Sequence, residues 1–68
     1  MNIVDLVIVG KVYEFDCEFL TPNRRRTEMI GGIVREIITE GNETFIILND
    51  HRAISTQNIT RVVGPYED

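Results

Sequence analysis

The sequence contains one cysteine and one histidine among its 68 residues, and it has no tryptophan. A lone cysteine cannot form a disulfide within the chain, and a free thiol is typical of a reducing compartment. One cysteine and one histidine also fall short of the ligand set of a structural zinc site. These absences exclude a fold stabilised by disulfides or by a structural zinc ion. We expect neither a metal nor a cofactor.

The sequence also lacks a long apolar run. Residues 1–10 are the most apolar stretch, but Asp5 interrupts them and no basic leader or cleavage site accompanies them. They are far shorter than the roughly 20 apolar residues that a membrane-spanning helix needs. We therefore expect a cytoplasmic protein that does not contact a membrane, and we interpret this segment as folded structure.

Positive charge is scarce, with 7 basic residues against 11 acidic ones and a formal net charge of −4. This balance favours solubility and disfavours non-specific binding to nucleic acid or anionic membranes. A chain of this length buries only about 60% of its unfolded surface, and such small domains often oligomerise. We predict a single domain over residues 1–68, with 66–68 as a frayed tail and homo-oligomerisation left open.

Apolar and acidic side chains alternate between Lys11 and Leu20. One face holds Tyr13, Phe15, Cys17 and Phe19. The other face holds Glu14, Asp16 and Glu18, which we call the acidic stripe. A period of two predicts a half-buried strand. The β-branched run Ile3–Val9 predicts a further strand, or an extension of this one beyond Gly10, rather than a helix.

Turn-forming residues divide the rest of the chain into short segments. Four more strands are predicted, at about 27–39, 44–48, 52–54 and 59–63. Gly31 and Gly32 predict a bend in the long strand, and the continuous apolar run in 44–48 predicts burial on both faces. The polar segment 55–58 predicts a single 3₁₀ turn.

This order of strands and breakers resembles an SH3-like barrel, and the Sm-like barrel shares the layout. The stretch GGIVREII…ETFIILND, followed by ISTQNITRVV, carries the resemblance over about residues 13–63, and NITRV is similar to the closing strand of such barrels. The resemblance implies an all-β fold: a small five-stranded SH3-like (Sm-like) barrel with one 3₁₀ turn before the last strand. Fold alone does not fix function.

The acidic stripe is the first candidate site. Alternate residues of a strand lie about 7 Å apart, so neighbouring carboxylates could share a divalent ion or act as an acid–base pair. The simpler interpretation is the solvated face of an edge strand, where outward charge discourages aggregation. In a third interpretation Glu14, Asp16 and Glu18 bind a basic surface of a partner protein.

Three consecutive arginines are the strongest local departure from the acidic background: Arg24, Arg25 and Arg26. Guanidinium groups suit phosphate oxygens, and loops carry much of the binding in SH3-like and Sm-like barrels. Single-strand recognition usually adds interleaved aromatic residues, and here only Tyr66 is free to serve. The simpler interpretation is a solvated loop whose charge is neutralised by Glu18 or Glu28.

No catalytic constellation is visible. Cys17 is expected to be a buried structural thiol, and His51 an ordinary exposed histidine in a turn. Ser55 and Thr56 are expected to cap the 3₁₀ turn. We therefore expect no enzymatic activity and no catalytic residue.

The sequence favours a small non-enzymatic binding or regulatory module that docks to a partner protein, of the kind that phages and other mobile elements encode. Such a module would use a free sheet edge or the acidic stripe. The alternative is an Sm-like RNA- or DNA-binding protein that acts as a homo-oligomer and uses the three arginines.

Overall fold

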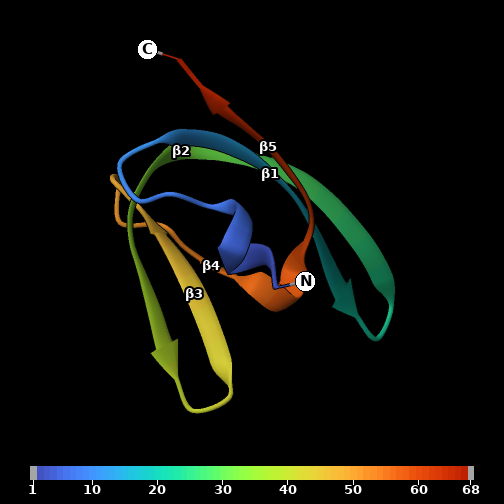
Figure 1. The fold of residues 1–68 in the computed structure, drawn as a ribbon. Coiled ribbons are helices and arrows are strands. Elements are labelled where there is room, and N and C mark those ends of the chain that lie inside the picture. Colours follow the sequence, from blue (N-terminus) through green and yellow to red (C-terminus); the bar gives the residue numbers. More distant parts are fainter. Residues whose placement is uncertain (1, 68) are drawn as a thin grey trace.

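The computed structural model describes residues 2–67, which form five antiparallel strands and two 3₁₀ turns (Figure 1). The strands are β1 (Val12–Thr21), β2 (Arg24–Glu40), β3 (Glu43–Leu48), β4 (Ala53–Ser55) and β5 (Ile59–Tyr66). The 3₁₀ turns are η1 (Ile3–Leu6) and η2 (Thr56–Asn58). The strand order is β4-β3-β2-β1-β5. The all-β prediction is confirmed, but the end strands β4 and β5 do not pair in the described chain, so the sheet is not closed.

Strand β2 joins the two halves of this sheet. It pairs with β1 as far as Ile33 and with β3 from Val34 onward. Gly31 and Gly32 precede the change of partner. A Cβ at Gly31 would lie 3.3 Å from the Glu14 side chain, which is tighter than ordinary packing. The glycine pair therefore lets β2 pass closely over β1 where the strand changes partner.

The hydrophobic core lies between the two halves. The large side chains with almost no exposed surface are Tyr13, Phe15, Cys17, Val34, Ile46 and Leu48. The predicted alternation along β1 is confirmed, since every second residue from Tyr13 to Cys17 is buried. The predicted burial of both faces of β3 is wrong. Phe45 and Ile47 are only half-buried, because no second layer covers the outer face of β3 within residues 2–67.

The N-terminal segment differs from its predicted strand. It begins with the η1 turn, where the Asn2 side chain accepts a hydrogen bond from the Val4 amide at 3.3 Å. Val7 then enters the core, and the Ile8 amide donates to the buried Tyr13 hydroxyl at 2.8 Å. These contacts override the strand propensity of the β-branched residues. The segment consequently lies across the hollow side of the curved sheet (Figure 1).

The β1–β2 hairpin is tighter than predicted. The turn consists of Pro22 and Asn23 alone, so β2 begins at Arg24 rather than near Thr27. The Thr21 hydroxyl accepts a hydrogen bond from the Arg24 amide at 3.2 Å and donates one to the Arg24 carbonyl at 3.0 Å. The short turn therefore places the arginines in a strand and not in a loop.

The C-terminal strand is longer than predicted. Tyr66 belongs to β5 and lies opposite Val12 of β1, so the expectation of a frayed tail is wrong for this residue. Asp68 lies outside the described residues. Within residues 2–67, no helix combines the length and the apolar character that crossing a bilayer requires.

Candidate functional site

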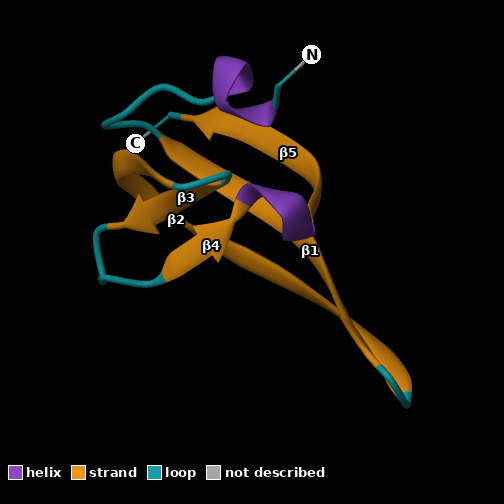
Figure 2. Cartoon of the chain, turned by 90° about the horizontal axis from the view of Figure 1, so that it is seen from below, coloured by secondary structure: helices purple, strands orange, loops and turns teal. Residues whose placement is uncertain are grey.

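The outer part of the β1–β2 hairpin projects from the body of the molecule as an arm, which we define as residues 18–27 (Figure 2). Strand β1 pairs with β5 only as far as Cys17, which lies opposite Ile59. In the described chain, the two strands of the arm therefore pair only with each other. The arm contributes to an elongated shape, with principal extents of 39, 26 and 25 Å.

The pairing register distributes the three arginines over both faces of the arm. Arg24 lies opposite Thr21, Arg25 opposite Leu20, and Arg26 opposite Phe19. Because side chains alternate along a strand, Arg24 and Arg26 share one face with Phe19, and Arg25 shares the other face with Leu20. All three arginines are exposed, so the arm presents guanidinium groups in opposite directions.

Phe19 is a site residue that the sequence interpretation missed. The Arg26 guanidinium carbon lies 5.0 Å from the centroid of the Phe19 ring, which is within cation–π range. The expectation that no aromatic residue accompanies the arginines is therefore wrong. The sequence could have indicated this contact, because a two-residue turn at 22–23 pairs residue 19 with residue 26 across the hairpin.

Little of the positive charge on the arm is neutralised. The nearest approach of Arg25 to Glu18 is 4.0 Å, between Nη1 and Oε2. Among residues 2–67, the structure contains no ion pair between Glu28 and any of the three arginines. The arm holds three of the seven basic residues of the chain and one of its eleven acidic residues. The sequence predicted a loop whose arginines are neutralised by Glu18 or Glu28. The structure shows instead one long contact, between Arg25 and Glu18.

The acidic stripe does not lie on an edge strand, because β1 is between β2 and β5. The edge-strand interpretation is therefore wrong for Glu14 and Asp16, because β5 pairs with β1 as far as Cys17. Glu18 lies beyond this point, in the arm, where β1 pairs with β2 alone. All three carboxylate residues are half-buried. Arg61 of β5 lies opposite Asp16 in the register, and Arg25 lies near Glu18. A hydrogen bond to Glu14 raises the pKa of the Tyr66 hydroxyl. Cations and hydroxyls thus interrupt the stripe.

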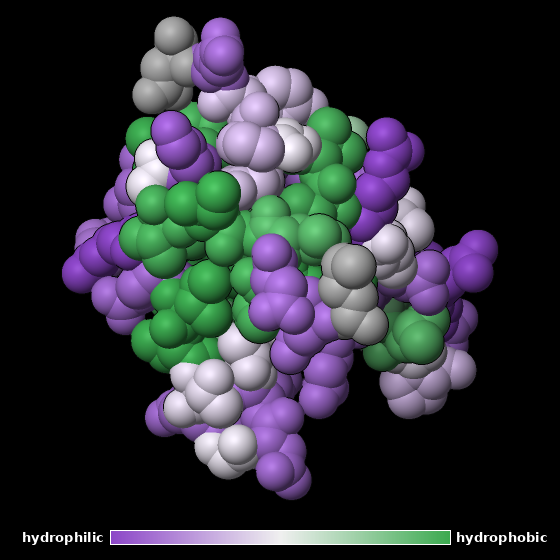
Figure 3. All heavy atoms as spheres, in the orientation of Figure 1, coloured by the Kyte–Doolittle hydropathy of each residue, from purple (hydrophilic) through white to green (hydrophobic). Residues whose placement is uncertain are grey.

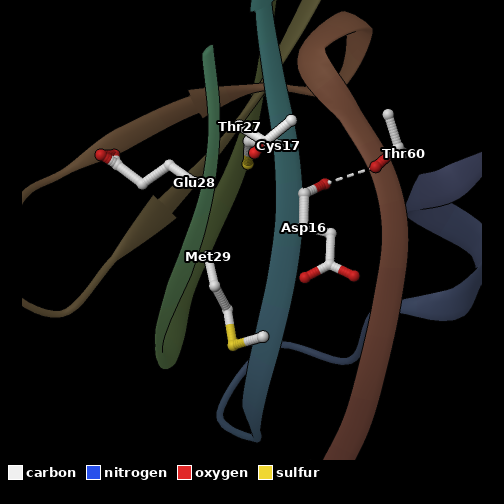
Figure 4. Close-up of a pocket in the computed structure, with 6 residues that line it drawn as sticks. All are labelled: Asp16, Cys17, Thr27, Glu28, Met29 and Thr60. Carbon is white, nitrogen blue, oxygen red and sulfur yellow. Dashed lines mark hydrogen bonds between the residues drawn. The ribbon is translucent and has the colours of Figure 1, made fainter.

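A shallow hollow opens where β5 leaves β1 (Figure 4). Its lining consists of Asp16, Cys17, Thr27, Glu28, Met29 and Thr60. The Thr60 hydroxyl donates a hydrogen bond to the Asp16 carbonyl at 3.1 Å. The two carboxylates point in different directions (Figure 4), because Asp16 and Glu28 lie on opposite faces of the sheet. They do not form an acid–base pair across this hollow.

The thiol beside this hollow is poorly suited to nucleophilic chemistry. Cys17 is 1% exposed, which confirms its expected burial. Burial raises the pKa of the Cys17 thiol, and the charges of Glu28 and Asp16 raise it further. The thiol therefore stays protonated near neutral pH. Within residues 2–67, the structure gathers no three His, Cys, Asp or Glu side chains into a cluster that could hold a metal ion.

Arg35 and Arg52 do not extend the patch on the arm. Arg35 contacts the exposed His51 ring, with 2.9 Å between Nη1 and Nδ1. Arg52 binds Asp50 at 2.6 Å and donates to the Gly31 carbonyl at 2.9 Å. These contacts cluster at the turn between β3 and β4. Arg35 lies about 30 Å along β2 from Arg26, the nearest arm arginine in the strand, at the rise of an extended strand. The positive charges thus form separate groups.

Ser55 has a structural role that fits its expected position. Its hydroxyl accepts a hydrogen bond from the Gln57 amide at 3.3 Å, which caps η2, and donates one to the Glu43 carboxylate at 2.9 Å. Every buried side-chain nitrogen or oxygen within residues 2–67 has a hydrogen-bond partner. Among the described residues, no buried side-chain polar group is therefore left for a ligand to satisfy.

The N-terminal segment exposes apolar surface. Leu6, Ile8 and Val9 are each about half exposed, at 49%, 58% and 53%. Figure 3 shows apolar side chains gathered over the middle of this face, with hydrophilic side chains around them. Such a contiguous apolar surface is typical of an interaction site.

Comparison with known proteins returned no match to this chain among protein-family models, curated proteins or solved structures.

Proposed function

We propose that this chain is a small non-enzymatic binding module whose arm engages the phosphate backbone of nucleic acid. The observation that carries the proposal is the presence of three exposed guanidinium groups on both faces of a projecting two-stranded ribbon. Guanidinium forks bind phosphate oxygens in a bidentate manner. Because the arginines point to both sides of the ribbon, phosphates can bind on either face of it.

The acidic composition of the chain does not oppose this proposal, because the charges are separated in space. Outside the arm, ten acidic residues stand against four basic ones. The body thus repels phosphate while the arm attracts it, which orients the arm toward the nucleic acid. Net charge describes the whole molecule, whereas binding depends on the surface that makes contact.

The strand arrangement supports an SH3-like (Sm-like) barrel as the fold of this module. Strand β2 is shared between two halves of the sheet, and η2 precedes the closing strand. The free ends β4 and β5 would allow neighbouring copies to pair edge to edge, as the proposed homo-oligomer requires. Several arms on one oligomer would bind a strand with higher avidity than one arm.

The test measures affinity for a labelled single strand and a labelled duplex between about 20 and 200 mM salt. Three phosphate contacts predict a slope of log K against log salt of roughly −2 for the single strand. Changing Arg24, Arg25 and Arg26 together to alanine should abolish this binding. The charge-matched control changes Arg35, Arg52 and Arg61 to alanine, and it should retain the slope. Arg61→Ala alone is the milder control, and circular dichroism verifies folding.

Three results would contradict the proposal. The wild type could fail to bind at the lowest salt, or the arm variant could bind with the wild-type slope. A glutamate-rich peptide of similar charge could also bind as tightly as the nucleic acid. That last result would identify the arm as a site for an acidic protein.

A partner protein is the second candidate, and the exposed side chains of Leu6, Ile8 and Val9 favour it. Its partner would present a complementary apolar surface, with the acidic stripe or a free sheet edge adding contacts. Ile8→Ser should then abolish the complex, while the triple arginine variant should keep it. Nucleic-acid binding by the arm predicts the opposite pattern for these two variants.

A further inference from the structure

The arm contains a small hollow on the face that bears Phe19. Four residues line it: Phe19, Thr21, Arg24 and Arg26. The register places all four on one face of the ribbon, with the Phe19–Arg26 pair nearer the body than the Thr21–Arg24 pair. Phe19 is half-buried and packs against the core, whereas the other three side chains are exposed. The hollow therefore has a half-buried aromatic floor and an exposed cationic rim.

We propose that this hollow is a subsite for one unpaired nucleotide, and that the nucleic acid bound by the arm is single-stranded. The inference rests on the proposed function and narrows its ligand. The base would stack against the Phe19–Arg26 pair, and the adjoining phosphate would bind the Arg24 guanidinium. Unpaired bases commonly stack on aromatic rings or on guanidinium planes in this way.

The Phe19–Arg26 pair supplies the stacking surface. The guanidinium lies 5.0 Å from the ring centroid, so ring and cation form one layered unit. A base adds to such a unit through dispersion and cation–π attraction, whichever of its four identities it has. The subsite would therefore bind bases without marked sequence preference.

Thr21 acts as a positioning residue in this arrangement. Its hydroxyl is engaged with the backbone amide and carbonyl of Arg24, at 3.2 and 3.0 Å. These bonds hold the backbone at the tip of the arm, from which the Arg24 side chain extends. Arg25 points to the opposite face and would contribute charge without entering the hollow.

The position of Phe19 distinguishes a single strand from a duplex. The ring is recessed beside the body, where acidic residues outnumber basic ones. In a duplex the base faces are already stacked, and two phosphate backbones would have to approach that acidic body. A single strand can turn one base toward the ring while its phosphates stay at the rim.

The experiment uses Phe19→Trp as a reporter, because the chain has no tryptophan of its own. A single strand of about 15 nucleotides should quench the fluorescence of this residue, and a blunt duplex of equal length should not. Phe19→Leu keeps an apolar side chain against the core but removes the aromatic face. It should weaken single-strand binding by about 5- to 100-fold, the range expected for losing one base stack.

Two controls separate stacking from charge and packing. An abasic strand carries the same phosphates but no bases. The affinity of the wild type for this strand should be as low as the affinity of Phe19→Leu for the normal strand. Leu20→Ala lies on the opposite face and should change affinity less than about twofold, a difference typical of peripheral contacts. Circular dichroism establishes that each variant is folded.

The outcomes separate this subsite from the proposed function. In one outcome, Phe19→Leu binds the normal strand as tightly as the wild type does, and the wild type binds the abasic strand as tightly as the normal strand. If the triple arginine variant loses binding in the same experiment, the subsite is wrong and the arm binds by electrostatics alone. Preference for the duplex, with no quenching of Phe19→Trp, would also overturn the subsite. If the wild type binds no nucleic acid at low salt, both proposals fall.

Discussion

The inner and outer halves of strand β1 belong to one continuous hairpin, yet they differ in side-chain burial and in strand pairing. From Tyr13 to Cys17, alternate side chains are fully buried, and strands pair on both sides. From Glu18 to Thr21, β1 pairs with β2 alone, and no side chain is fully buried. The hairpin therefore changes from structural core to exposed arm at Cys17.

This difference shows how a small domain separates stability from binding. The inner half is fixed by burial of aromatic and aliphatic surface, which dominates the free energy of folding. The arm contributes little burial, so its side chains are free to be arginines. Phe19 is the arm residue that packs against the core, and the Thr21 contacts and the short turn hold the tip of the arm.

The sharpest test of this comparison removes one side chain from each half. Phe15→Ala deletes a ring with no exposed surface, and we expect it to lower the free energy of unfolding by about 3–5 kcal/mol. Leu20→Ala deletes a side chain that is 73% exposed, and its effect should stay within about 0.5 kcal/mol. Urea titrations followed by circular dichroism measure both. Similar losses for the two variants would mean that the arm is part of the cooperative core.

The second prediction concerns the boundary itself. The pKa of the Cys17 thiol is raised by burial and by nearby carboxylates, so the folded state holds this proton more tightly than the unfolded state does. The resulting stability is full below the ordinary thiol pKa of about 8.5 and is lost as pH rises through the raised value. Above about pH 8.5, stability should therefore fall as pH rises, by at most about 1.4 kcal/mol per pH unit for this one proton.

Cys17→Ala provides the control for this pH dependence. The alanine variant should be less stable at neutral pH but should show a flatter profile across the same range. Urea titrations at each pH, with a reductant present, measure the two slopes. Equal slopes would show that the thiol is solvated at the base of the arm, and the boundary would then lie deeper in the hairpin.

The sequence predicted the inner half better than the arm, and the reason is physical. Alternating aromatic and acidic residues report burial directly, so the faces of β1 were assigned correctly. Similarly, Ser55 caps the 3₁₀ turn as expected, because capping depends on neighbouring residues alone. The segment Ile3–Val9 failed, because distant partners such as the Tyr13 hydroxyl decide its conformation.

The candidate site was predicted only in part. Arg24, Arg25 and Arg26 were recognised from their charge, but their alternation between two faces depends on the length of the turn. Phe19 was assigned to the core face alone, and its place beside Arg26 follows from cross-strand pairing. The acidic stripe was placed on an edge because no local signal shows that β5 returns to pair with β1.

The smallest expected effect concerns the contact between Glu18 and Arg25 within the arm. Glu18→Gln removes the carboxylate that lies 4.0 Å from Arg25, an exposed pair whose loss should change the free energy of unfolding by less than about 0.5 kcal/mol. The same change removes the one acidic charge of the arm, so single-strand affinity at low salt should rise. The slope of log K against log salt should stay nearly constant, because the number of phosphate contacts is unchanged. Glu36→Gln on β2, outside the arm, alters net charge equally and should raise affinity less. Equal gains from both variants would show that net charge, and not the local field of the arm, governs binding.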